Sequence, residues 1–161
     1  KIDYTKVRRH DINSKKIPEE RFIRKGDVLV NSTGVGTLGR VAQVNEEPFE
    51  KTTVDTHVTI IRPNKELFDL NFFGNSLIKI EKQLEQSGDG TSGQTELSRI
   101  KLENKIQIPI IKSTNKQKTI SLLLNSVFEN TFTLRSLTTK IIDNLKDLKF
   151  SLLQKELNNN S

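Results

Sequence analysis

Two serine–lysine pairs have the residue types and the spacing of a catalytic group. Ser98 lies three residues before Lys101, and Ser113 lies three residues before Lys116. A lysine at this spacing can activate the serine hydroxyl as the nucleophile of a hydrolase. The partner motifs of that enzyme class, S-D-N and K-T-G, are absent, and Ser113 stands at a predicted helix cap. We therefore expect no catalytic residues in the chain.

Three glycines, Gly34, Gly36 and Gly39, form a G-x-G-x-x-G pattern directly after a short apolar strand. In dinucleotide-binding folds a helix follows this pattern at once, and its N-terminus binds the pyrophosphate. Here residues 40–44 alternate like a second strand, and Pro48 closes the segment. The glycines therefore predict a tight loop between two antiparallel strands, and not a nucleotide site.

Residues that could bind a metal ion are scarce. The chain has two histidines, His10 and His57, and no cysteine, which excludes disulfides and thiolate metal sites. A lone histidine on a strand is more often a hydrogen-bonded structural residue than a metal ligand or a base. We expect no metal site and no cofactor.

The net charge of +6 is compatible with nucleic acid or an anionic membrane surface as a partner. Much of the positive charge lies in residues 1–25, which either form a solvated surface or line a phosphate backbone. No apolar run approaches the roughly 18 residues that a membrane span needs. We expect a cytoplasmic protein that does not bind membranes.

The remaining pattern predicts an α+β fold with a small mixed sheet. Strands are expected at 28–30, 40–44, 54–61 and 105–108, and helices at 65–86 (broken near Gly74) and 96–102. Loops rich in Gly, Ser and Thr are expected between them, at 31–40 and 87–94. We place a globular domain at residues 1–111 and a long helix at 112–161.

An apolar repeat near the end of the chain predicts that long helix. The predicted helix-pairing residues recur at heptad spacing: Ile120, Leu123, Val127, Leu134, Leu137, Ile141 and Leu148. Thr114 and Gln117 fit a capping box that opens the helix. From residue 120 to 157 the helix would be about 55–60 Å long, against about 30 Å for a domain of the remaining residues. We therefore expect a second helix to cover the repeat, although packing on its own domain is the alternative.

The intervening heptad positions also include polar residues, Asn130, Asn144 and Ser151. An unpaired amide in a dry helix interface is penalised by about 1–3 kcal/mol, so such residues restrict the register and the partner. The repeat therefore predicts a helix that selects one partner and one alignment.

The order of several motifs along the chain resembles the specificity subunit of type I restriction-modification systems. The matching segments are GDVLVNSTG at 26–34, GTLGRVA at 36–42, DTHV at 55–58, GTSGQTELS at 90–98, IQIP at 106–109, Gln117 with Ile120, and LLQK at 152–155. The resemblance covers residues 11–155, which correspond to one target recognition domain and one spacer helix. It implies either a half-subunit or a C-terminal fragment of a longer subunit.

The resemblance implies a non-catalytic protein that reads DNA. In this family the domains recognise double-stranded DNA, and the helices pair as an antiparallel coiled coil. Modification (methyltransferase) subunits carry S-adenosylmethionine and methylate adenine, and a separate subunit cleaves DNA. The partners expected here are DNA, the modification subunits, and a second specificity half or a second copy of this chain.

Short polar and basic side chains on or beside the two Gly-rich loops are the predicted DNA contacts, since such side chains can enter a groove. They are Asn31, Ser32, Thr33, Thr37, Arg40, His57, Ser92 and Gln94. For Arg40 the alternative is a cross-strand ion pair with a nearby glutamate. For the whole chain the alternative is a coiled-coil adaptor whose small globular head binds protein, its positive charge merely keeping it in solution.

Overall fold

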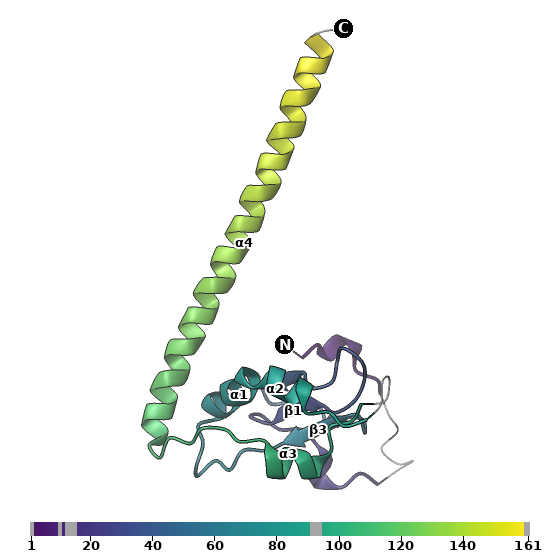
Figure 1. Cartoon of the computed structure of the whole chain (residues 1–161), viewed down its shortest axis with the longest axis vertical. Helices are drawn as coiled ribbons and strands as arrows, with labels where there is room; N and C mark the ends of the chain where they lie inside the picture. The colour runs from purple at the N-terminus through teal and green to yellow at the C-terminus, as the bar shows by residue number, and fades with distance from the viewer. Residues whose placement is uncertain (1, 10, 12–15, 91–94, 160–161) are drawn as a thin grey trace. The chain divides into compact units, whose positions relative to one another are not determined.

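The structure is a computed structural model that describes residues 2–9, 11, 16–90 and 95–159 (Figure 1). It divides into two compact units, Lys1–Ser121 and Leu122–Ser161. The first unit contains two 3-10 turns, η1 (Tyr4–Lys6) and η2 (Glu19–Arg21), strands β1 (Val28–Asn31), β2 (Val41–Gln43) and β3 (Val58–Ile61), and helices α1 (Leu70–Lys79), α2 (Glu81–Gln86) and α3 (Arg99–Lys105). Helix α4 (Thr114–Asn159) begins in the first unit and forms the second. The predicted α+β class is confirmed.

The sheet has the order β2-β1-β3, and both of its strand pairs are antiparallel. The prediction of a mixed sheet is therefore wrong for the strands that the structure describes. Val28 and Val30 of the central strand are fully buried, and they alternate with half-buried neighbours. This alternation is the two-residue period that predicted a strand here.

The predicted strand at 105–108 is wrong. Helix α3 includes Lys105, and residues 106–110 have no regular structure. Ile106 and Ile108 nevertheless pack against the core, as their alternation suggested. The alternation correctly indicated which side chains are buried, but no neighbouring strand pairs with this segment.

The strand predicted at 54–61 forms only in its second half. β3 begins at Val58, because the backbone N–H of His57 donates to the Asp55 carboxylate (2.8 Å) and closes a turn. His57 therefore precedes the strand that was predicted to carry it. On the other side of this turn, Thr53 forms an isolated antiparallel bridge with Phe22.

The helix predicted at 65–86 is interrupted at Ile80, which ends α1 and precedes α2, and not near Gly74. Gly74 lies inside α1, where a Cβ atom would stand 2.1 Å from Oε1 of Gln43. The Gln43 side chain occupies this space and donates its amide to the Leu70 carbonyl oxygen (2.5 Å). The glycine thus allows α1 to approach β2 closely and does not break the helix.

The core lies between the sheet and helices α1 to α3. It consists of Val28, Val30, Leu38, Phe73, Leu77, Leu84, Leu97 and Leu102, with partly buried apolar residues around them. Each helix therefore contributes apolar side chains to this core, as expected of amphipathic helices.

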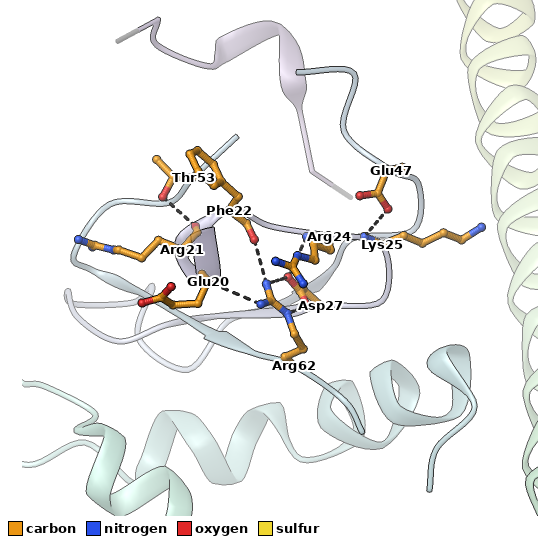
Figure 2. Close-up of polar contacts among 9 residues, drawn as sticks. All are labelled: Glu20, Arg21, Phe22, Arg24, Lys25, Asp27, Glu47, Thr53 and Arg62. Carbon is orange, nitrogen blue, oxygen red and sulfur yellow. Dashed lines mark hydrogen bonds and ion pairs between the residues drawn. The ribbon is translucent and has the colours of Figure 1, made fainter. Parts of the chain in front are cut away.

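A buried ion pair ties the N-terminal segment to the end of β3 (Figure 2). Asp27 is 1% exposed, and Arg62 donates to both of its carboxylate oxygens at 2.8 and 2.7 Å. The same guanidinium donates to the carbonyl oxygens of Phe22 (2.8 Å) and Glu20 (3.4 Å). The hydrogen bonds that Arg62 donates to Asp27 raise the pKa of Arg62 above its ordinary value. Arg62 therefore stays charged and holds residues 20–27 together.

Helix α4 starts differently from the prediction. The capping side chain is Ser113, whose Oγ accepts the N–H of Lys116 at 3.3 Å, and the predicted Thr114–Gln117 capping box is wrong. Gln117 is fully buried, and its side-chain amide forms hydrogen bonds outside the helix cap. It accepts the Asp69 N–H at 2.7 Å and donates to the carbonyl oxygens of Leu67 (2.8 Å) and Ile111 (2.6 Å). The first unit consequently extends beyond residue 111 to Ser121.

Candidate nucleic-acid interface

The Gly-rich loop between β1 and β2 has the predicted hairpin geometry. Asn31 donates its N–H to the Arg40 carbonyl oxygen (2.9 Å), and its own carbonyl oxygen accepts the Gly39 N–H (2.8 Å). Gly39 has φ +80°, and a Cβ atom there would stand 2.3 Å from the backbone N of Glu85 in α2. The third glycine of the pattern therefore allows the loop to pack against a helix, and a second strand follows it.

Three segments that are distant in the sequence meet at this loop. The Ser32 N–H donates to the His57 carbonyl oxygen at 2.7 Å, and the Ser32 carbonyl oxygen accepts the Leu97 N–H at 2.8 Å. Thr33 also forms an isolated antiparallel bridge with Glu96. The structure thus brings together the β1–β2 loop, the 55–57 turn and residues 95–97. We call this surface the loop cluster.

Within the loop cluster, most of the predicted contact residues have at least part of their surface exposed. Thr33 Oγ1 lies 2.9 Å from Nδ1 of the exposed His57 ring. Asn31 donates its side-chain amide to the Thr33 carbonyl oxygen (2.8 Å), and Thr37 donates its hydroxyl to the same oxygen (3.2 Å). These bonds fix the shape of the loop, so its remaining polar atoms have defined positions.

Ser32 differs from the other predicted contacts because it lies inside the domain. It is 5% exposed, and its hydroxyl lies 2.6 Å from that of Thr59 on β3. Its backbone joins the three segments, as described above. The side chain therefore supports the loop cluster from beneath.

Arg40 is exposed at the end of the loop, and it forms no ion pair with a described acidic residue. The alternative prediction, a cross-strand ion pair with a glutamate, is therefore wrong for the described part of the chain. Its guanidinium is available for another partner.

Ser92 and Gln94 lie outside the described residues. The base of the loop that carries them is described, because the Asp89 and Glu96 backbones exchange hydrogen bonds of 2.9 and 2.8 Å. Lys101 also pairs with the Asp89 carboxylate at 2.5 Å. The base of this loop is thus fixed next to Thr33, the bridge partner of Glu96.

Two acidic residues of the loop cluster, Asp55 and Glu96, were not among the predicted site residues. Asp55 fixes the turn at His57, and Glu96 is exposed beside Thr33. The spacing of an aspartate two residues before a histidine is typical of a side chain that caps a tight turn, and it could have indicated this role. Carboxylates at a DNA interface can accept a hydrogen bond from the N4 amine of cytosine, but they repel phosphates.

Both serines of the serine–lysine pairs cap helices, as predicted for Ser113 but not for Ser98. Ser98 and Ser113 are the N-terminal caps of α3 and α4, and each accepts the N–H of its lysine, Lys101 or Lys116, at 3.3 Å. Serine is a preferred capping residue because its oxygen satisfies an otherwise unpaired N–H. Among the described residues, no group of three or more His, Asp or Glu side chains could hold a metal ion.

The second candidate site is the exposed apolar surface of α4. The seven predicted helix-pairing residues are between 37% and 66% exposed, with Ile120 at the lower limit and Leu123 at the upper. Neighbouring apolar residues widen this surface, and they are also exposed: Leu124, Phe128, Leu145, Leu152 and Leu153. No described helix is both long enough and apolar enough to cross a membrane. An apolar surface of this extent indicates an interaction site.

No protein-family model matches the sequence, and no curated protein matches it either.

Proposed function

We propose that this chain recognises DNA sequence as the non-catalytic specificity subunit of a type I restriction-modification complex. In this proposal the loop cluster contacts DNA, and α4 pairs with a second helix in an antiparallel coiled coil. Partner modification subunits would methylate adenine at the recognised site. The observation that carries the proposal is the meeting of three polar segments, 31–40, 55–57 and 95–97, at one surface.

The chemistry of the loop cluster supports DNA readout. Asn31, Thr33, Thr37 and His57 are short or planar polar side chains, and Arg40 has a free guanidinium. Such groups hydrogen-bond base edges in the major groove, while cations contact phosphates. The hydrogen bonds within the loop reduce the entropy that would be lost on binding, since its backbone is already ordered.

The exposure of the α4 repeat supports a helical partner. The helix has 46 residues and is therefore about 69 Å long. Its large apolar side chains from Leu122 onward are exposed in the single chain, and the heptad spacing fits a coiled coil. A second copy of the chain would place two identical readers on one DNA molecule, and its two-fold symmetry would select a palindromic site.

DNA binding is tested with Arg40→Ala in the full chain. We expect the wild type to prefer one sequence, and its affinity to fall by at least about tenfold between 50 and 200 mM salt. The substitution should weaken binding to the preferred sequence by about 1–3 kcal/mol, and binding to unrelated DNA by less. Fluorescence anisotropy on both DNAs measures the difference.

Three other results would revise this function. Equal weakening on both DNAs would make Arg40 a phosphate contact, and no change on either DNA would remove it from the site. A wild-type chain that shows neither sequence preference nor salt dependence would favour the adaptor, in which only protein is bound. Adenine-methylation mapping in cells, with and without the gene, tests whether the chain directs modification.

A further inference from the structure

We propose that His57 is a specificity-determining residue that donates a hydrogen bond from Nε2 to guanine, and that Thr33 positions it. This inference rests on the proposed function and adds the chemistry of one contact. It follows from the hydrogen bonds around His57. They leave Nε2 of the ring without a hydrogen-bond partner among the described residues.

The structure fixes His57 at three atoms. Its N–H donates to the Asp55 carboxylate (2.8 Å), its carbonyl oxygen accepts the Ser32 N–H (2.7 Å), and its Nδ1 lies 2.9 Å from Thr33 Oγ1. Beneath this arrangement, the hydroxyls of Ser32 and Thr59 lie 2.6 Å apart. Backbone and ring are both held, yet the side chain is exposed. In the described part of the chain, Nε2 has no hydrogen-bond partner.

The hydrogen bond with the Thr33 hydroxyl is linked to the protonation of Nε2. When this hydroxyl donates to Nδ1, the neutral ring carries its hydrogen on Nε2, because a neutral imidazole has one donor and one acceptor nitrogen. The doubly protonated ring also has an N–H at Nε2. Either atom of the Thr33–His57 contact can be the donor. We assign the Thr33 hydroxyl as the donor, so that Nε2 carries a hydrogen and needs an acceptor on DNA.

Guanine is the base that best fits a single donor. Its major-groove edge has two adjacent acceptors, N7 and O6, whereas adenine places a donor amine beside N7. Phosphate oxygens are also acceptors, but the Asp55 carboxylate is bound to the same residue and would repel them. Glu96, exposed beside Thr33, adds a second negative charge to this surface. The loop cluster therefore favours a base edge over the backbone at this point.

The test is selection from a randomised DNA library, using the full-length wild type and three variants. His57→Phe keeps a planar ring but removes both nitrogens, and Thr33→Val keeps the shape but removes the hydroxyl. Thr33→Ser keeps the hydroxyl and is the matched control. Circular dichroism and thermal melting verify that each variant is folded.

We expect His57→Phe to reduce the preference for guanine at one position of the site by about 2- to 12-fold, the effect of one hydrogen bond. Thr33→Val should reduce that preference at the same position, and Thr33→Ser should retain it. The preferences at all other positions should be unchanged. A structural role alone would weaken binding to every sequence and would not alter one position.

Two results would overturn this inference while leaving the proposed function intact. A wild-type preference that His57→Phe leaves unchanged would exclude His57 from base readout. A uniform loss of affinity across sequences, in a folded His57→Phe variant, would make His57 a phosphate contact or a purely structural residue, and in either case it would not read a base. If the wild type itself selects no sequence, the proposed function fails and this inference fails with it.

Discussion

The two parts of helix α4 have opposite distributions of buried and exposed side chains. In its first turns the buried residues are polar: Gln117 is 0% and Ser121 1% exposed. From Leu122 onward the large apolar residues are exposed, between 36% for Leu124 and 73% for Phe132. Apolar residues are normally the buried ones, so the second part of the helix reverses the usual pattern.

The two parts of the helix also differ in their polar contacts. Gln117 satisfies its amide on Leu67, Asp69 and Ile111, and Ser121 donates to the Asp69 carboxylate (3.3 Å), which also caps α1. The buried polar side chains at the start of α4 thus find all these hydrogen-bond partners within the first unit. The rest of the helix presents an apolar heptad repeat, which we propose is buried by another helix.

Two charges in the heptad repeat are expected to have the largest effect on the chain. Leu134→Asp together with Ile141→Asp would place two charges in the proposed dry helix interface, and each unpaired buried charge costs several kcal/mol. We expect the self-association of the chain to be lost at all accessible concentrations, as measured by sedimentation velocity. The globular unit should remain folded.

The matched control adds the same charges to another face of the helix. Ser136→Asp together with Thr139→Asp should leave self-association within about threefold of the wild type, because these positions lie outside the heptad repeat. A wild type that stays monomeric at high concentration would contradict pairing between two copies. The partner helix would then belong to another part of a longer subunit.

A second substitution tests the buried polar start of α4. Gln117→Leu removes the partner of one N–H and two carbonyl oxygens. Leaving a buried polar group unpaired costs about 1–3 kcal/mol, so for these three groups we expect the free energy of unfolding to fall by at least about 3 kcal/mol. Urea denaturation followed by circular dichroism measures this loss.

The neighbouring Lys118 is exposed, and Lys118→Leu should change the free energy of unfolding by less than about 0.5 kcal/mol. Equal effects of the two substitutions would show that the Gln117 hydrogen bonds contribute nothing.

Gln117 also shows what the sequence could not reveal. Its position after Ser113 and Thr114 suggested a local capping role, because sequence patterns detect only neighbouring residues. Its actual partners include Leu67 and Asp69, which lie far away in the chain. The apolar repeat was different: its period alone indicated the helix and its exposed surface, since both depend on local spacing.

The same limit applies to the loop cluster. The glycines and the strand-like residues 40–44 were sufficient to predict the β1–β2 hairpin, which is a local structure. The contact between Thr33 and His57 could not be predicted, because the pairing of β1 with β3 sets it. For Ser32, polarity suggested exposure, but its hydrogen bond to Thr59 allows burial without an unpaired hydroxyl.

The smallest expected effect concerns a polar contact on the exposed part of α4. Lys146 pairs with Asp143 at 3.2 Å, and both side chains are more than half exposed. Such pairs on a helix surface stabilise by at most about 0.5 kcal/mol, because water screens the charges and the side chains lose entropy. We expect Lys146→Ala to leave both the free energy of unfolding and the self-association nearly unchanged. If calorimetry shows a loss of more than about 1 kcal/mol, Lys146 contacts a partner chain, and the interface of α4 is wider than its heptad repeat.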